Sequence, residues 1–438
     1  MPLISAVPFV VLLLVIAFGP LVAPKAWARH RTQALVAAVV SLPILFYLGG
    51  HDQAALLEPV KEYISFIVVI GALFVISGGV HIGGSLSGTP RANATLLGIG
   101  AVLANLVGTT GASALLIRPL LRANKTRKRT AHIVVLFIFI VSNCAGLLTP
   151  LGDPPLLLGF LKGVPFEWTL RLWPQWLLVN AILLIVFKVW DERVFAAEER
   201  RRPGSQLAEV LKHEPLHVDG LVSVWYLIGV LVTIVAAGRA TMVGQPWRWG
   251  VQEIIVAGLA VAAYTWTSDE PRKANAFTFG PLIEVAVLFA AIFVTMAPVL
   301  EILNQWSAGA RDVLGIKFGL SQPAHFFWAT GALSSILDNA PTYLAFSTSA
   351  AGLQNVAPHG AFLQAYLATG PEASEMLAAV ASGAVFMGAM TYIGNAPNFM
   401  VRAIAEESGV KMPSFVEYMK YSVGILVPIL VLVTVLFF

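Results

Sequence analysis

Two short motifs of matching composition carry the residues best suited to bind an ion. Residues 149–155 read TPLGDPP and residues 391–397 read TYIGNAP, so both follow the pattern T-x-x-G-[D/N]-x-P. Proline removes a helical hydrogen-bond donor and glycine permits a non-helical backbone, so each motif is expected to unwind a helix. Inside a membrane, the freed carbonyls and half-helix ends can hold ions. Asp153 and Asn395 lie at the two unwound points; the alternative is a proline kink without a ligand.

Further amide and hydroxyl side chains recur near each motif. They are Asn105, Thr109, Thr110, Asn143 and Thr149 in the first half, and Ser335, Asn339, Thr342 and Asn398 in the second. Oxygen ligands of this kind suit a small hard cation such as sodium. The same groups could instead hold a substrate carboxylate, cap helices or form interhelical hydrogen bonds.

Acidic side chains are rare in the apolar parts of the chain. Of 24 Asp and Glu residues, only Asp153, Glu284 and Asp338 fall clearly within apolar runs. Such a buried acid is a candidate functional residue. Burial favours the neutral acid and a bound cation favours the carboxylate, so proton release is coupled to cation binding. Asp153 and Asp338 are therefore the predicted cation and proton ligands, with Asn105 and Asn339 beside them. Glu284 joins the candidates, although an interfacial or helix-dipole role is the alternative.

The composition indicates where such residues must lie. The chain has 438 residues, of which 57% are hydrophobic and 12% are charged, whereas soluble domains carry about 25% charged residues. This excludes an ordinary soluble enzyme, a disordered protein and a nucleic-acid binder, and it predicts a polytopic membrane protein. The single cysteine, Cys144, excludes an internal disulfide and a Cys-rich metal site.

The distribution of Lys and Arg predicts the topology. Residues 118–130 contain six basic residues and no acid, so this segment is expected in the cytoplasm. If the basic segment 25–31 also lies in the cytoplasm, counting crossings from it places both ends of the apolar run 94–117 on the cytoplasmic side. A re-entrant hairpin with its tip over 104–111 satisfies this condition. The alternatives are a misplaced loop or one long kinked helix.

The remaining runs then divide the chain into two similar halves. Residues 1–190 are predicted to form three crossings, the hairpin 94–117, a broken helix over 131–161 and a helix over 172–190. A cytoplasmic linker is expected over 191–219. Residues 220–438 repeat this order from the opposite side, with a hairpin over 324–350, a broken helix over 376–404 and a helix over 421–438. The fold class is therefore an all-α polytopic membrane protein with an inverted-topology repeat.

Four stretches resemble a known superfamily. Residues 105–113 (NLVGTTGAS), 148–155 (LTPLGDPP), 335–342 (SILDNAPT) and 392–398 (YIGNAPN) resemble the ion transporter superfamily. In particular, they are similar to NhaD-type sodium/proton antiporters and to a related branch of citrate transporters. The resemblance implies a homodimer, elevator-like movement, and ion sites formed by two hairpin tips and two broken helices. Carboxylate-transporting relatives have Ser-Asn at the tips, whereas this chain has Asp338-Asn339.

These observations predict a secondary transporter that exchanges sodium or lithium for protons in a bacterial inner membrane. The alternatives are cation-coupled transport of citrate or another carboxylate, and efflux of an oxyanion. No nucleophile–base pair or histidine cluster indicates an enzyme, and no bound cofactor is expected. The expected partners are the lipid bilayer, the small cation and a second copy of the chain, with no nucleic acid.

Overall fold

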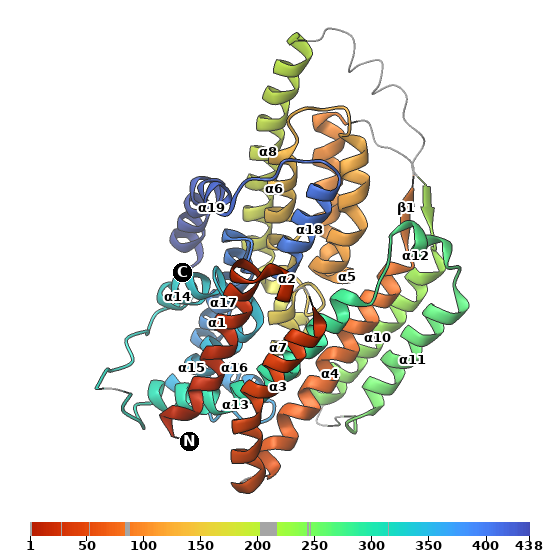
Figure 1. Cartoon of the computed structure of the whole chain (residues 1–438). Helices are drawn as coiled ribbons and strands as arrows, with labels where there is room; N and C mark the ends of the chain where they lie inside the picture. The colour runs from red at the N-terminus through yellow and green to blue at the C-terminus, as the bar shows by residue number, and fades with distance from the viewer. Residues whose placement is uncertain are drawn as a thin grey trace.

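The computed structural model describes residues 2–27, 29–51, 53–83, 88–201, 217–242, 245, 247–313 and 315–438, and they are almost entirely helical (Figure 1). Within these ranges, eight helical segments are long and apolar enough to cross a membrane. The chain is therefore an all-α, multi-pass membrane protein, as its composition predicted. About half of the predicted linker 191–219, residues 202–216, lies outside the described residues.

One group of helices, which we call the frame, packs around α4 and α13. Its members are α1 (Val7–Val22), α3 (His30–His51), α4 (Gln53–Gly78), α10 (Val222–Met242), α11 (Val251–Trp266) and α13 (Gly280–Ser307). Figure 1 shows α4, α10 and α11 side by side. Short elements precede or join them: η1 (Leu3–Ala6), α2 (Pro24–Trp27) and α12 (Glu270–Ala274).

The remaining helices form a second group, which we call the site bundle. It contains α5 (Pro90–Ala123), α6 (Ala131–Ile140), η2 (Cys144–Leu147), α7 (Pro154–Leu161), η3 (Phe166–Leu172), α8 (Trp173–Arg201), α14 (Pro323–Ser334), α15 (Asn339–Leu353), α16 (Phe362–Leu367), α17 (Pro371–Met387), η4 (Gly388–Met390), α18 (Ala396–Glu407) and α19 (Phe415–Phe437). Both T-x-x-G-[D/N]-x-P motifs lie in its interruptions, between η2 and α7 and between η4 and α18.

Helix α5 doubles back on itself at Gly108, where φ is +80° and ψ is 155°. Near its two ends, the Asn93 amide donates to Asn124 Oδ1 over 2.9 Å, and the Asn124 amide donates in return over 2.8 Å. A straight helix would separate these residues by about 46 Å, so the two arms must run antiparallel. The left-handed backbone at the reversal favours glycine, because a Cβ there is strained.

The α14–α15 segment also reverses, and its turn occupies residues 335–338. Phe326 and Phe346, on either side of the turn, have ring centroids 6.4 Å apart, which requires antiparallel arms. The far end of α15 packs on the end of α13, where the Asn304 amide donates to the Thr348 carbonyl over 3.2 Å. The arms of α5 instead end beside β1, where Arg122 donates to the Ile82 carbonyl. The two turns thus approach each other from opposite ends of the molecule.

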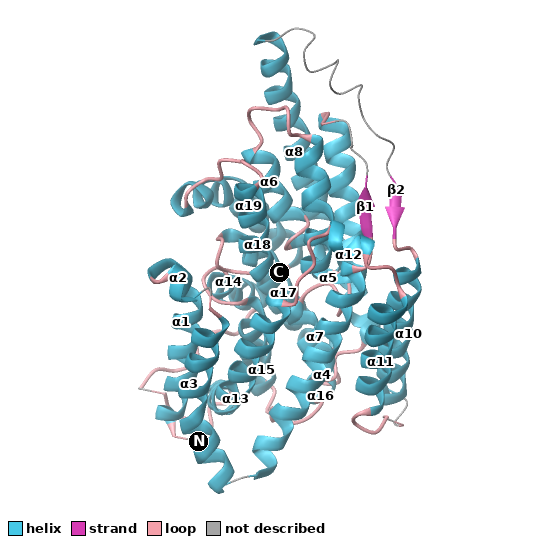
Figure 2. Ribbon diagram, turned by 45° about the vertical axis from the view of Figure 1, so that its right-hand side comes forward, coloured by secondary structure: helices cyan, strands magenta, loops and turns pink. Residues whose placement is uncertain are grey.

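We call the end that carries residues 118–130 the basic end. A two-stranded antiparallel sheet lies there, formed by β1 (His81–Gly83) and β2 (His217–Asp219), and Figure 2 shows the two strands side by side. The start of α13 reaches the same end, because Phe277 and Phe74 have ring centroids 5.2 Å apart. By the positive-inside rule this end is expected to face the cytoplasm.

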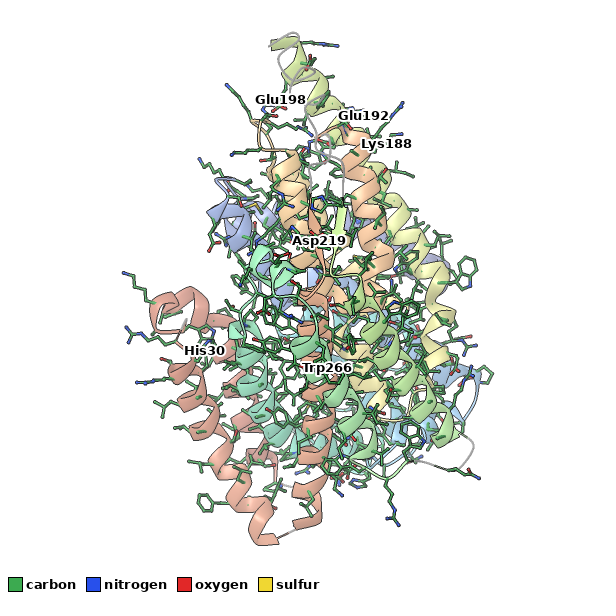
Figure 3. All side chains as sticks on the ribbon, turned by 90° about the vertical axis from the view of Figure 1, so that its right-hand side faces the viewer. His30, Lys188, Glu192, Glu198, Asp219 and Trp266 are labelled. Atoms are coloured by element: carbon green, nitrogen blue, oxygen red, sulfur yellow. The ribbon has the colours of Figure 1, made fainter. Side chains whose placement is uncertain are left out.

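Helix α8 runs past its expected end at residue 190 and continues to Arg201. Residues 191–201 read DERVFAAEERR and are rich in strong helix formers, so the helix persists where the apolar run stops. Figure 3 labels Glu192 and Glu198 on this charged part of α8 and Lys188 just before it, far from Trp266 on α11. The predicted linker therefore begins as a helix.

Candidate ion-binding site

The carboxylate of Asp153 is the centre of the candidate site, and its side chain is almost fully buried. The Thr109 hydroxyl donates to Oδ1 over 2.7 Å, and the Asn339 amide donates to Oδ2 over 2.5 Å. Asn395 Nδ2 lies 3.4 Å from Oδ1. Thr109 directly follows the α5 turn, Asn339 directly follows the α14–α15 turn, and Asn395 belongs to the second motif. One carboxylate thus gathers partners from both halves of the chain.

The backbone around each motif is fixed by the same kind of bond. Thr149 donates its hydroxyl to the Asn105 carbonyl over 2.5 Å, and Thr391 donates to the Ser335 carbonyl over 2.5 Å. Each acceptor lies three residues before the reversal point of its hairpin, at Gly108 or Asp338. The threonine of each motif therefore docks the broken helix against a hairpin turn.

Close backbone approach explains the glycine in each motif. A Cβ at Gly152 would overlap the carbonyl oxygen of Gly146, and a Cβ at Gly394 would overlap that of Gly388. Gly152 also accepts a hydrogen bond from the Thr109 backbone amide over 2.8 Å. Because backbone atoms fill this space, a side chain there would push Asp153 away from Thr109.

Gly152→Ala is therefore expected to destabilise the protein by roughly 1–3 kcal/mol, the usual cost of overpacking, and to impair transport. Thermal unfolding in detergent measures the first effect. Gly258→Ala on α11 is the matched control, because open space surrounds that position. Wild-type melting and wild-type transport by Gly152→Ala would contradict this account.

A chain of buried amides extends from Asp153 into the second half. Asn395 donates to Asn143 Oδ1 over 3.1 Å, and Asn143 donates to Asn398 Oδ1 over 2.7 Å. Asn398 in turn donates to the carbonyls of Gly388 and Thr391, each over 2.9 Å. Asn143 and Asn398 thus orient Asn395, and neither touches the Asp153 carboxylate.

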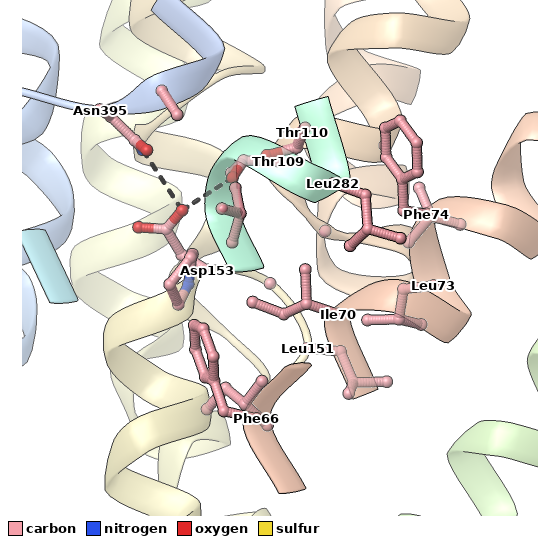
Figure 4. A pocket seen from close by; sticks show the side chains of 18 of the residues that line it. Phe66, Ile70, Leu73, Phe74, Thr109, Thr110, Leu151, Asp153, Leu282 and Asn395 are labelled. Atoms are coloured by element: carbon pink, nitrogen blue, oxygen red, sulfur yellow. Dashed lines mark hydrogen bonds between the residues drawn. The ribbon is translucent and has the colours of Figure 1, made fainter. Parts of the chain in front are cut away.

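A cavity of about 90 Å³ adjoins Asp153. Figure 4 shows the Asp153 carboxyl between Asn395 and Thr109, with Ile70, Leu73, Phe74 and Leu282 of the frame on the opposite side. Thr110 and Asp338 also line this cavity, and its described lining contains no Lys, Arg or His. Asp338 caps α15 by accepting from the Ala340 backbone amide over 3.1 Å.

An oxygen without a partner also lies beside Asp153. Asn339 is fully buried, and its Oδ1 has no hydrogen-bond partner among the described residues. Leaving a buried acceptor unpaired costs free energy. Like the two oxygens of the Asp153 carboxylate, it is an oxygen of the kind that hard cations prefer. Across the described ranges, no group of three or more His, Cys, Asp or Glu residues could hold a metal ion.

Several predicted residues do not reach the carboxylate. Asn105 donates to the Ala101 carbonyl and accepts from the Leu148 backbone amide, each over 2.9 Å. Ser335 and Thr342 donate to the carbonyls of Gly331 and Asp338. These side chains, like that of Thr149, shape the backbone. Glu284 lies apart from the site cavity and accepts from Gln33 over 2.8 Å.

The sequence reasoning missed a buried charge cluster at the basic end. Asp191 is fully buried and accepts from Arg127 at 2.5 and 3.0 Å, from His132 Nε2 at 2.9 Å and from Asn93 at 3.1 Å. Asn93 and Asn124 join the two arms of α5, so this cluster ties the base of the hairpin to α8. Its sequence signal was Asp191, the acid that directly follows the apolar run 172–190.

A family model described as "Putative citrate transport" matches residues 1–438. The chain belongs to this family. No curated protein matches it. The family and the apolar helices together identify a multi-pass membrane transporter. They do not single out the NhaD-type antiporters among the transporter families that the motifs resemble.

Proposed function

We propose that this transporter exchanges a small monovalent cation, sodium or lithium, for protons, and that Asp153 binds the two in turn. The observation that carries the proposal is a buried carboxylate next to the unpaired Oδ1 of Asn339, on a cavity whose described lining has no basic side chain. A buried carboxylate is stable when it is protonated or paired with a cation. Competition between the two ligands gives exchange.

The arrangement of the frame and the site bundle supports a moving-carrier mechanism. The candidate site lies between them, since the frame residues Phe66, Ile70 and Leu282 face Asp153 across the cavity. Sliding of the site bundle along α4 and α13 would carry the ion between the two membrane surfaces. The inverted repeat, the homodimer and the inner-membrane location belong to the same proposal.

Cation-coupled citrate transport is the second candidate, and two observations favour it. The family description names citrate. In addition, the amides of Asn339 and Asn395 and the hydroxyl of Thr109 are donors that a substrate carboxylate can accept. Here Asp153 would hold only the coupling cation. Because a citrate anion would meet Asp153 and Asp338 without a basic partner in the described lining, we place this function second.

Reconstitution separates the two candidates. Liposomes that contain the protein and a pH-sensitive dye, with an acidic interior, are given sodium, lithium, potassium or citrate outside. Exchange predicts rapid dye recovery with sodium or lithium alone. Citrate transport predicts uptake of labelled citrate and no proton movement with sodium alone, which would overturn the first proposal. Glu192→Gln is the matched control, because Glu192 is half exposed on α8.

A further inference from the structure

Three cavities lie in order along α4 and α13. At the opposite end from residues 118–130, a cavity of about 320 Å³ is lined by Glu58 and Glu62 of α4 and Glu301 of α13. The site cavity follows, lined by Phe66, Ile70, Leu73 and Phe74 of α4 and by Pro281, Leu282, Val285 and Phe289 of α13. A third, of about 320 Å³ at the basic end, is lined by Phe74, Ser77, Gly78 and Pro281 among others.

The site cavity connects differently to its two neighbours. It shares Phe74, Gly111 and Pro281 with the cavity at the basic end, and it shares no described residue with the cavity at the opposite end. An aromatic layer separates the site cavity from the cavity at the opposite end. In this layer, the centroid of the Phe66 ring is 4.7 Å from that of Phe289 and 5.6 Å from that of Phe293. All three rings are buried. The site is thus closed toward the opposite end.

Polar contacts between the frame and the site bundle also close this end of the molecule, beyond the aromatic layer as seen from the site cavity. Lys162 forms an ion pair with Glu62, and both side chains are largely buried. The Gly360 backbone amide donates to Glu58 over 2.5 Å, and His359 lies 3.8 Å from Glu301. Every one of these contacts joins a carboxylate of the frame to a loop of the site bundle. The first turn of α16, which follows the loop with His359 and Gly360, is also joined to the Lys162 segment, because the Leu363 amide donates to the Lys162 carbonyl over 3.0 Å.

Lys162 has a direct structural connection to the ion site. Asp153 precedes the first turn of α7 and Lys162 follows its last turn. Because a helix of this length is rigid, with a span of about 12 Å, Asp153 and Lys162 must move together. The Glu62–Lys162 ion pair therefore restrains the position of Asp153 relative to α4, and the pair must break if Asp153 moves along α4.

We propose that the Glu62–Lys162 ion pair, supported by Glu58 and the Gly360 amide, is a gate that closes the site toward the end opposite residues 118–130. The gate must open in each transport cycle for the site to reach that surface. Its role rests on the proposed transport function, but its closure is a property of the protein alone and is tested without any cargo. Breaking the ion pair leaves a buried charge unpaired in the closed state, so the open state gains population.

Thiol labelling provides the test, because Cys144 is the single cysteine and is fully buried. A reporter cysteine is introduced as Val285→Cys, on the α13 face of the site cavity. A membrane-impermeant maleimide is then applied to right-side-out vesicles, whose outer surface is the opposite end. Glu62→Gln and Lys162→Met are each expected to raise the labelling rate at least threefold. The charge swap Glu62→Lys with Lys162→Glu should return it toward the starting value.

Arg171→Gln is the matched control, because Arg171 bonds Ser374 and both residues belong to the site bundle. Its labelling rate should stay unchanged. Unchanged labelling in both single variants would overturn the gate. The gate would also be overturned if the labelling rate rose equally from both membrane faces and the charge swap did not restore it, because that pattern indicates a general loosening of the protein. Absence of sodium-driven proton flux in the wild-type protein, together with the expected labelling pattern, would instead count against the proposed function.

Discussion

Asp153→Asn is expected to lower sodium-driven proton flux at least 100-fold while the protein stays folded. Asparagine keeps the size of the side chain but removes the negative charge that the proposed exchange requires. Its amide oxygen can still accept from Thr109, and a flipped Asn339 amide can present its own oxygen to the amide nitrogen that replaces Oδ2. Flux is measured in dye-loaded liposomes, and folding is followed by gel filtration and thermal unfolding. Retention of more than a third of the wild-type flux would exclude Asp153 as the coupling residue.

The proposed exchange also predicts a pH dependence of the wild-type protein. If protons and cations compete for Asp153, the apparent affinity for sodium should fall as the pH is lowered and rise as it is raised. Proton competition at a single site predicts up to a tenfold change in apparent affinity per pH unit. A variant with residual flux but no such dependence would place the proton on another group. Asp338→Asn tests the nearest alternative, since Asp338 lines the same cavity.

Asp191→Ala is expected to destabilise the protein by about 3–5 kcal/mol, which is the cost of removing one partner from a buried ion pair. Arg127, which is itself buried, would lose both of its bonds to the carboxylate. The base of the α5 hairpin would then loosen from α8. The shift in thermal unfolding in detergent measures the effect.

A matched control lies on the same helix. Lys188 and Glu192 are 4.0 Å apart and about half exposed, and exposed pairs contribute about 0–1 kcal/mol. Glu192→Ala should therefore melt within a few degrees of the wild type. Similar losses in Glu192→Ala and Asp191→Ala would show that the buried cluster has no special role.

The sequence predicted the features that depend on local backbone chemistry. Proline and glycine at fixed spacing marked both helix breaks, and the charge pattern required a reversal within 94–117, where α5 turns at Gly108. The observed reversal follows from sterics and from the need to satisfy polar backbone, both of which are visible in a short window of residues. The membrane orientation and the repeat stay predictions.

Features that depend on distant contacts were harder to predict. Asp191 stands at the edge of an apolar run, and nothing near it in sequence shows that Arg127 and His132 surround it. Asn105 has the residue type and the sequence position expected of a ligand, but its Oδ1 accepts a hydrogen bond from the Leu148 backbone amide. Residue type indicates what a side chain can bind, and only packing decides which of its possible partners is within reach.

The opposed approach of the two hairpin turns has a thermodynamic consequence. Thr109 reaches Asp153 from a hairpin rooted at one end of the molecule, and Asn339 reaches it from a hairpin rooted at the other. In this structure the site cavity adjoins the cavity at the basic end and is closed toward the opposite end, so the two surfaces would have access to the carboxylate only in turn. A carrier built in this way has no built-in rectification, so the ion and proton gradients alone would determine the direction of net flow. Reversing the ion and proton gradients across the same vesicle membrane should therefore reverse the direction of the net flux.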